Sequence, residues 1–460
     1  MLFNSLPFLY GFLPIAYLVF WRLRSASQRY VWLTISGYVF YGAWDYRFCA
    51  LMAFSTCVSY LAGLGMLLWD ANESRRRLCL VVPVVTDLAL LGFFKYAGFT
   101  LESVRWLTTL AGHPLRVPTL NIILPIGISF YTFHTISYVV DSYRRVIVPT
   151  RKFWEFSCYV SLFCQLVAGP IVRFRQIEAD LNNIERVDRR AYWNRGWSFF
   201  VMGLAKKVIL ADTIASVIDP ALGHYRGLST VSVWLVMIGY ASQIYFDFSG
   251  YSDMAVGLGA LFGLRIPQNF NSPYKATDPS SFWQRWHISL STCMRDYVYI
   301  PLGGNRRSEY RNLVLTMLLA GAWHGANWTF IAWGAYHGAL LITYRLARKR
   351  WDTLPESLRR AAMFIFVVVG WVFFRATSLS MAATILRHMF VPTDGVPVVG
   401  AGTLAAMVLF TIAIAMGTKN TFEIDHRWSP PMTAALASVF AVSLALIYST
   451  NSSPFLYFQF

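Results

Sequence analysis

The chain has 460 residues, of which 56% are hydrophobic and only 14% are charged. Because a soluble domain carries about a quarter charged residues, this composition excludes an ordinary soluble enzyme and predicts a polytopic membrane protein. The formal net charge of +17 would also fit nucleic acid, but the basic residues gather in loops between apolar runs. The positive-inside bias and anionic lipid headgroups explain that distribution, so we predict contact with membrane lipids and no nucleic-acid binding. The six cysteines show no paired spacing, and we predict neither a metal nor a bound cofactor.

The first apolar run, residues 8–21, comes before any basic residue, and Arg22 and Arg24 follow it. A secretory signal peptide carries its positive charges before the apolar core, so we predict an uncleaved first span with the N-terminus outside. The basic clusters after the third and fifth apolar runs then both fall inside, and a charged loop with Glu102 and Arg105 falls outside. The five predicted spans of this part are 8–21, 31–44, 48–69, 78–96 and 120–140.

A shorter apolar run, residues 156–171, holds Gly169 and Pro170. It is too short to cross the bilayer core as one helix, so we predict a re-entrant or interfacial segment. Further apolar runs follow, and the polar loops between them are too short to fold alone. We therefore predict an all-α polytopic membrane protein with about eleven spans plus re-entrant helices. We expect one domain, residues 1–460, with its functional core at about 120–345.

Two acidic residues stand between apolar runs in the second half of the chain. The run 228–246 is long enough for a span, whereas 254–264 is too short to cross alone, so we treat the two as separate. Asp247 and Asp253 bracket the polar insert between them. Such an insert indicates either a cavity wall that contacts substrate or a structural hydrogen-bond network.

Residues 313–344 contain no Asp, Glu, Lys or Arg, yet they include His324 and His337. A straight helix of this length would reach roughly 48 Å, against a bilayer core of about 30 Å, and two full spans would need about 40 residues. Gly321 and Gly325 flank His324, so we predict a break there, with backbone groups facing a cavity. A histidine at that depth is either a general base or a residue that caps the broken helix.

The segment before this run is polar, basic and aromatic, and it contains His287. Aromatic side chains beside arginines are typical of the membrane interface, and they are equally suited to an adenine ring and phosphates. Both interpretations remain open at this point. The candidate substrate-binding residues are Trp283, Arg285, Trp286, Arg295, Tyr297 and Asn327, together with Asp247 and Asp253.

Several strings, in this order, resemble the membrane-bound O-acyltransferase family, in its bacterial branch of alginate O-acetyltransferase-like enzymes. Among them, YFDFSGYSDMAVGLG, RDYVYIPLGGNR and AGAWHGANWTFIAWGAYHG are long enough to be specific. The resemblance covers nearly the whole chain. The matching strings lie at 124–141, 163–174, 245–259, 269–291, 295–306, 320–338, 370–376 and 455–460.

The resemblance implies a ring of helices with a cytoplasmic and a periplasmic funnel, in a bacterial inner membrane. It also implies transfer of an acetyl group from cytoplasmic acetyl-CoA to an exported polysaccharide such as alginate or cellulose, directly or through a periplasmic partner protein. The family's membrane histidine matches His324, which would act as general base. Its second histidine matches His287, which would position the donor or stabilise the oxyanion. Arg285, Arg295, Arg306 and Arg307 would bind the phosphates of coenzyme A.

Two other functions remain open at this stage. One is a relative in the same family that acts on teichoic acid or on a lipid. The other is a proton-coupled transporter, because histidines within the membrane can relay protons. A transporter with two related halves would show internal symmetry, and we find none in the chain.

Overall fold

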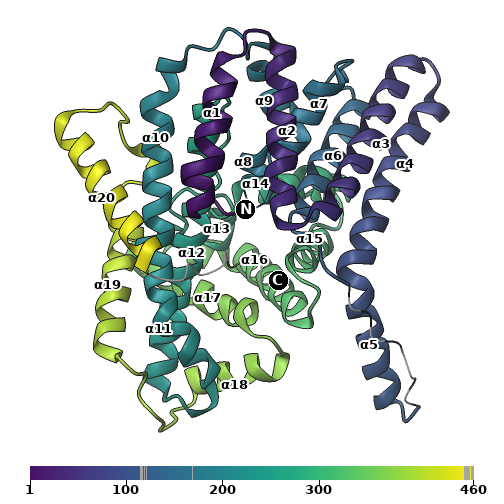
Figure 1. The fold of residues 1–460 in the computed structure, drawn as a ribbon. Helices are drawn as coiled ribbons and strands as arrows, with labels where there is room; N and C mark the ends of the chain where they lie inside the picture. The colour runs from purple at the N-terminus through teal and green to yellow at the C-terminus, as the bar shows by residue number, and fades with distance from the viewer. Residues whose placement is uncertain are drawn as a thin grey trace. The chain divides into compact units, whose positions relative to one another are not determined.

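The computed structural model describes residues 1–449, except 114, 116, 117, 119, 121 and 168, together with Leu456. Within these residues every named element is a helix, and the only β-type pairing is an isolated bridge between Leu228 and Val396. Figure 1 shows the chain as packed helices. The prediction of an all-α protein is confirmed.

The chain divides into two compact units. The first contains Met1–Gly196 and Leu258–Pro267, and the second contains Trp197–Gly257 and Gln268–Phe460. Two helices, α10 and α12, run from one unit into the other. The prediction that residues 1–460 form one domain stays a prediction.

The first unit contains helices that agree with the first four predicted spans, whereas the helix within the fifth predicted span, 120–140, begins only at Ile128. Their starts carry recognisable caps: Ser25 and Gln28 form a capping box on α2, and Asn72 caps α4 through the backbone N–H of Arg75. The elements are η1 Pro7–Phe12, α1 Leu13–Arg22, α2 Ala26–Asp45, η2 Tyr46–Phe48, α3 Cys49–Leu68, α4 Glu73–Leu91, η3 Gly92–Tyr96, α5 Ala97–Leu110, α6 Ile128–Tyr143, α7 Phe153–Ser161, α8 Phe163–Leu166, α9 Phe174–Asn182 and α10 Arg189–Ala205.

The predicted loop around Glu102 and Arg105 is wrong, because these residues lie in helix α5. Helical structure continues through η3 into α5 and ends only at Leu110. Gly112 follows with a φ of +79°, the left-handed conformation that commonly terminates a helix. Charged residues on an exposed helix face do not interrupt backbone hydrogen bonding, so they were a poor signal for the end of this helix.

Residues 156–171 form no long helix in the part that the structure describes. Helix α7 ends at Ser161 after nine residues, and α8 has four residues. Each is too short to span a hydrocarbon core of about 30 Å. Both helices are therefore as short as the re-entrant prediction requires. The re-entrant placement itself stays a prediction.

The second unit contains the segment with the candidate histidines. Apart from the end of α10, its elements are η4 Lys206–Ala211, α11 Asp212–Gly223, η5 Tyr225–Gly227, α12 Thr230–Leu261, η6 Pro273–Lys275, α13 Pro279–Trp283, α14 Ile288–Met294, η7 Arg295–Tyr299, α15 Glu309–His324, α16 Trp328–Trp351, α17 Glu356–Arg375, α18 Leu379–Phe390, α19 Ala401–Gly417, η8 Thr421–Glu423 and α20 Pro430–Ser449.

The prediction that 228–246 and 254–264 are separate segments is wrong, because one helix, α12, runs through both without interruption for 32 residues. The polar insert does not break it, since both acidic residues have cationic partners. Asp247 pairs with Lys207 at 2.6 Å and Asp253 with Lys206 at 2.5 Å. A buried carboxylate with such a partner is compatible with a continuous helix at membrane depth.

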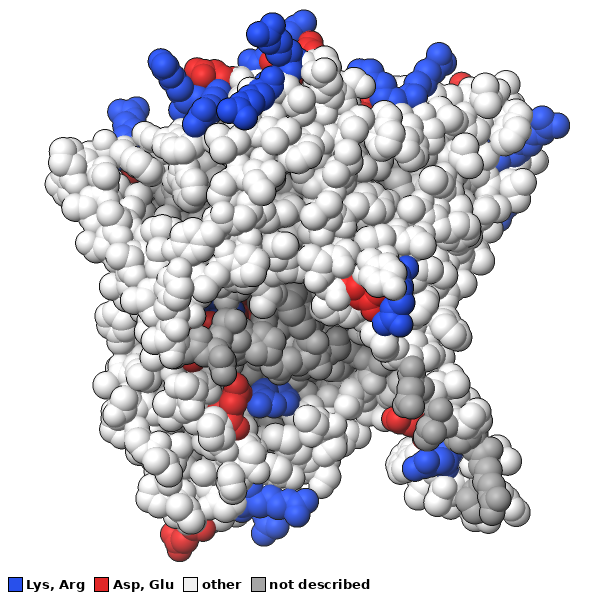
Figure 2. Space-filling model, in the orientation of Figure 1, with Lys and Arg blue, Asp and Glu red and all other residues white. Residues whose placement is uncertain are grey.

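Among the described residues, five helical segments are long and apolar enough to cross a membrane. They are Ala26–Leu68, Glu73–Leu110, Thr230–Leu261, Glu356–Arg375 and Pro430–Ser449. Figure 2 shows broad uncharged areas on the visible face, as a membrane-embedded surface requires. A total of about eleven spans stays a prediction.

Candidate functional site

The long uncharged run folds as a helical hairpin that breaks beside His324. Helix α15 ends at His324, Gly325–Asn327 link the two helices, and α16 begins at Trp328. The Asn327 side chain caps α16 by accepting a hydrogen bond from the backbone N–H of Thr329 at 3.0 Å. The break predicted from length and glycine content is confirmed. At 1.5 Å per residue, the two helices are roughly 24 Å and 36 Å long.

Small residues let the two helices of the hairpin pack backbone against backbone. A side-chain carbon at Gly321 would overlap the carbonyl oxygen of Phe330, and one at Gly334 would overlap that of Met317. Such close contact between helices is typical of membrane proteins, in which small residues allow helix backbones to approach. It fixes the end of α15, and therefore His324, against α16.

Aromatic rings surround the imidazole of His324, which is buried. The ring centroids of Trp323, Trp333 and Phe374 lie 4.9, 5.0 and 5.1 Å from it, and all three rings stand edge-on. These residues come from α15, α16 and α17 respectively. His324 thus lies in a water-poor, three-helix environment, where a proton transfer is shielded from solvent.

His287 is fully buried in the same unit, immediately before helix α14. Its backbone has a φ of +45°, a conformation that costs energy in a residue with a side chain and recurs at functional sites. Its ring packs edge-on against Phe248, with centroids 4.7 Å apart. Burial lowers the pKa of His287 to about 3, so the ring is neutral at physiological pH.

The structure brings the two predicted histidines together. The ring centroids of His287 and His324 lie 6.4 Å apart. Trp323 contacts both rings, with centroids 5.9 Å from His287 and 4.9 Å from His324. Two imidazoles at this separation can act on the same small reacting group.

His337 contacts Trp333, one of the rings that surround His324. Its ring centroid is 4.8 Å from that of Trp333, which in turn contacts His324. The ring of Trp283 also packs against His337 at 5.2 Å. His337 therefore belongs to the aromatic layer that supports the site.

The candidate residues around His287 have separate contacts. Trp283 packs edge-on against Trp333 at 5.6 Å, and Trp286 lies 4.7 Å from Trp371. The guanidinium of Arg285 donates to the carbonyl oxygen of Asn271 at 3.1 Å. These contacts pack all three side chains against neighbouring residues of the second unit.

Two of the remaining candidates, Arg295 and Tyr297, lie on a short helix, η7. Arg295 is exposed and pairs with Asp296 at 2.7 Å. Tyr297 is half-buried on the same helix. Arg306 and Arg307 follow in an exposed turn before α15. All four side chains are polar or basic groups ahead of the hairpin.

Asp247 and Asp253 belong to a buried network of ion pairs on α12. Asp253 accepts hydrogen bonds from Lys206 at 2.5 Å and from the Thr421 hydroxyl at 2.6 Å. Lys207 bridges Asp247 at 2.6 Å and Asp212 at 2.7 Å. These contacts are those of a structural network, one of the two interpretations that the sequence left open.

Sequence reasoning missed the residues that frame the histidines. Asn269 contacts the ring of His287, and Trp333 and Phe374 contact that of His324. Two local features of the sequence could have pointed to them. Asn269 lies in a string rich in Asn, Ser and Pro. Trp333 lies four residues before His337, which puts the two side chains on one helix face.

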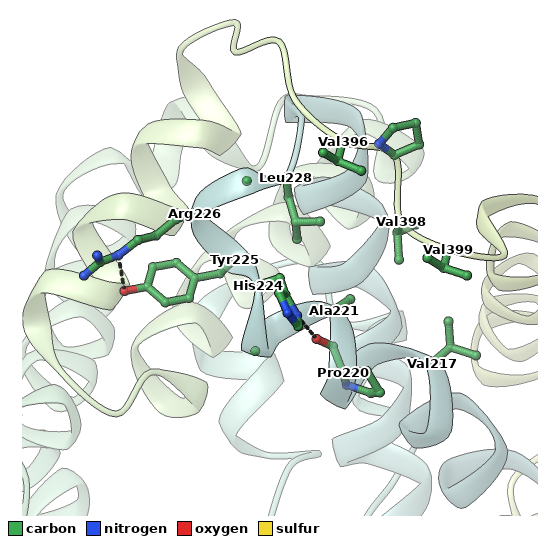
Figure 3. Close-up of a pocket in the computed structure, with 13 residues that line it drawn as sticks. Val217, Pro220, Ala221, His224, Tyr225, Arg226, Leu228, Val396, Val398 and Val399 are labelled. Atoms are coloured by element: carbon green, nitrogen blue, oxygen red, sulfur yellow. Dashed lines mark hydrogen bonds between the residues drawn. The ribbon is translucent and has the colours of Figure 1, made fainter.

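A cavity of about 870 Å³ lies elsewhere in the second unit (Figure 3). Its walls come from residues 217–228 and 396–399, so it is not formed around His287 or His324. Val396, Val398 and Val399 face Val217 and Ala221 across it, and His224 donates to the carbonyl of Pro220 at 3.2 Å. Among the described residues, no group of three His, Cys, Asp or Glu side chains could hold a metal ion.

A helical membrane protein with two buried histidines beside a broken helix is the class that these features define. The chain belongs to the membrane-bound O-acyltransferase family, whose model matches residues 35–385, and it is an O-acyltransferase. It is 40% identical to the probable alginate O-acetylase AlgI of Pseudomonas putida, over all of both chains. It is 33% identical to the peptidoglycan O-acetyltransferase of Helicobacter pylori, over 100% of this chain and 98% of that protein.

A more distant similarity concerns another acyl group. The chain is 28% identical to the teichoic acid D-alanyltransferase of Streptococcus thermophilus, over 52% of this chain and 61% of that protein. Family membership establishes acyl transfer as the class of reaction. The transporter interpretation is therefore set aside.

Proposed function

We propose that this O-acyltransferase moves an acetyl group from cytoplasmic acetyl-CoA to a hydroxyl of an exported polysaccharide, directly or through a periplasmic partner protein. The observation that carries the proposal is the buried pair His287 and His324, with ring centroids 6.4 Å apart at the break of the hairpin. The names of the full-length relatives, an alginate and a peptidoglycan acetyltransferase, support an acetyl group and a glycan acceptor. Alginate, cellulose and similar exopolysaccharides are the acceptors that we propose.

In the proposed reaction, His324 is the general base. Its ring takes the proton of the acceptor hydroxyl, and the resulting oxygen nucleophile attacks the thioester carbonyl. The tetrahedral intermediate then expels the sulfur of coenzyme A, which takes the proton back from His324. The new ester bond replaces the thioester bond, so atoms and protons balance.

The surroundings of His324 favour this cycle in physical terms. His324 is the last residue of α15, and the partial negative charge at the C-terminus of a helix stabilises a transient imidazolium. The nearby rings of Trp333 and Phe374 exclude water, which strengthens that interaction. The helix end and the aromatic rings thus stabilise the charged imidazolium that forms when His324 takes up the proton.

Basic side chains mark the end of the hairpin away from His324. Arg306 and Arg307 precede α15, and Arg348–Arg350 end α16, a helix of roughly 36 Å. By the positive-inside bias we place this end at the cytoplasmic face of a bacterial inner membrane. There the arginines would bind the phosphates of acetyl-CoA. The same bias places the N-terminus in the periplasm.

A teichoic-acid or lipid acceptor is the alternative within the family. The D-alanyltransferase similarity covers about half of this chain, whereas the two acetyltransferase similarities cover all of it. The difference in coverage favours acetyl transfer to a glycan. Measuring which acyl ester the chain adds to host polymers distinguishes the two.

The test uses the intact chain in a host strain that lacks its own copy. We expect acetyl esters on the exopolysaccharide with the wild-type chain and almost none with His324→Ala, at equal amounts of membrane-inserted protein. His224→Ala is the matched control, since His224 is exposed beside the separate cavity and should leave acetylation unchanged. Full acetylation with His324→Ala would contradict the proposal that His324 is the general base.

The proposed orientation of the chain in the membrane can be tested separately. Reporter fusions that are active only in the cytoplasm should report there when placed in the link between α16 and α17, residues 352–355. The same reporter placed before Pro7 should be silent, because we propose that this end lies in the periplasm. The opposite pattern would contradict the proposed orientation without touching the chemistry.

A further inference from the structure

We infer that Asn269 is a positioning residue that fixes which ring nitrogen of His287 carries the proton. The role rests on the proposed acyl transfer, in which His287 acts at the reaction centre. Asn269 is buried, and its side-chain oxygen lies 3.2 Å from Nδ1 of His287. The same oxygen accepts hydrogen bonds from the hydroxyl and the backbone N–H of Ser289, at 2.9 and 3.2 Å.

The backbone N–H of Ser289 determines the direction of the bond to His287. A backbone N–H can only donate, so the amide atom of Asn269 that faces it must be the oxygen. An amide oxygen only accepts, so Nδ1 of His287 must be the donor. In a neutral imidazole the other nitrogen, Nε2, then carries the lone pair.

Backbone hydrogen bonds hold Asn269 beside His287 independently of its side chain. The carbonyl oxygen of Asn269 accepts from the N–H of Ile288 at 2.9 Å. The N–H of Asn271 donates to the carbonyl of Arg285 at 2.9 Å. Truncating the Asn269 side chain therefore removes the restraint on the ring while the frame of the loop stays in place.

The loop before η8 supports this frame from the other side. The Asn420 side chain donates to the side-chain oxygen of Asn271 at 3.0 Å. The ammonium of Lys275 donates to the carbonyl of Thr418 at 2.6 Å. Asn269 is thus part of a segment held at both ends, as a positioning residue requires.

The tautomer decides between the two roles left open for His287. Oxyanion stabilisation needs a donor at Nε2, whereas Nε2 of the fixed tautomer accepts. Protonation would turn Nε2 into a donor, but burial keeps the ring neutral above a pKa of about 3. His287 therefore accepts a hydrogen bond from a substrate hydroxyl or amide and so positions it.

The kinetic test measures thiol release from acetyl-CoA by the purified full chain, with de-acetylated exopolysaccharide of the host as acceptor. Asn269→Ala should lower kcat about 10–100-fold with KM for acetyl-CoA near wild type, because orientation is lost and donor binding is kept. Ser252→Ala is the matched control. It removes only the contact with Nδ2 of Asn269, at 3.3 Å, and should keep kcat. Equal losses in both variants, or none in Asn269→Ala, would overturn the role.

Asn269→Asp separates positioning from a merely structural role. A carboxylate still accepts from Nδ1, so most of kcat should return relative to Asn269→Ala. The negative charge stabilises the imidazolium and raises the pKa of His287. Since the neutral ring is the working form, the acid limb of the pH–rate profile should move to higher pH. An unmoved acid limb would contradict the assignment.

Histidine ¹⁵N NMR of the full chain in detergent reads the tautomer without any turnover, with His287→Gln used to assign the signal. We expect Nδ1–H in the wild-type chain and a mixture of tautomers in Asn269→Ala. An Nε2–H tautomer in the wild-type chain would overturn the inference even if the enzyme is active. A wild-type chain that has the expected tautomer but cleaves no acetyl-CoA would instead contradict the proposed function.

Discussion

Gly334 on α16 faces the backbone carbonyl oxygen of Met317 on α15, so closely that a side-chain carbon at residue 334 would overlap that oxygen. The relationship matters because α15 ends in His324. A backbone carbonyl within a helix cannot rotate away as the end of a side chain can. The close approach of the two helices therefore sets the position of the proposed base.

Gly334→Ala should lower both thermal stability and turnover. Alanine favours an isolated helix over glycine by about 1 kcal/mol, but the overlap with Met317 should cost about 1–3 kcal/mol and push α15 away. A shift of about 1 Å at His324 would reduce kcat roughly 100-fold. Thermal unfolding in detergent and acetyl-CoA turnover measure the two effects.

The matched control for this change is Gly338→Ala, one turn further along α16. There the nearest atom to an added carbon is Cα of Val314 at 3.5 Å, an ordinary van der Waals contact. We expect an unchanged or slightly higher melting temperature. If both alanine variants behave alike, close packing at Gly334 does not position the site.

Lys207→Met should destabilise the fold far more than the loss of a surface ion pair. Lys207 is buried and forms ion pairs with both Asp212 and Asp247, at 2.7 and 2.6 Å. Its removal leaves two carboxylates without their cation, at a cost of about 3–5 kcal/mol. Thermal unfolding of the purified chain measures the loss.

Arg348→Gln is the comparison for this prediction, because Arg348 makes an exposed ion pair with Asp352 at 3.3 Å. Its loss should cost at most about 1 kcal/mol. Adding Asp247→Asn to Lys207→Met should restore part of the stability. A Lys207→Met chain as stable as Arg348→Gln would show that the network is not structural.

Asn327→Ala should reduce stability by about 1 kcal/mol through loss of the α16 cap. Asn327 also donates to the carbonyl of Thr377 at 3.0 Å, which connects the hairpin to the link between α17 and α18. Asn327→Ser keeps a capping oxygen and should recover most of the melting temperature. If both variants instead raise KM at an unchanged melting temperature, Asn327 binds substrate, as the sequence suggested.

The sequence was sufficient to predict features that depend on a single constraint along the chain. Bilayer thickness and helix rise placed the break beside His324, because a run of 32 uncharged residues fits neither one span nor two. It was insufficient where partners are distant. The cations that keep α12 continuous, Lys206 and Lys207, lie 40 or more residues before Asp247 and Asp253, and no local pattern pairs them.

The same limit applies to the site itself. Phe374 reaches His324 from a helix fifty residues further along, and Asn269 reaches His287 across eighteen residues. Hydrophobic periodicity predicts which face of a helix is buried but not which aromatic ring lies against which histidine. The identity of the histidines followed from the sequence, whereas their mutual position required the packed structure.

The double variant Arg306→Gln/Arg307→Gln should weaken binding of acetyl-CoA without slowing the chemical step. Both side chains are exposed in the turn before α15, at the end away from His324. Contacts with the phosphates of coenzyme A are made equally in the ground and transition states, so KM should rise about tenfold at constant kcat. Because exposed charges are screened, the ratio of mutant to wild-type KM should shrink in high salt.

The control is Arg427→Gln, whose side chain is 94% exposed and lies outside this turn. This variant should leave KM unchanged. An equal rise in KM in the control would mean that total charge rather than this turn attracts the donor, and a fall in kcat alone would place these arginines in the chemical step.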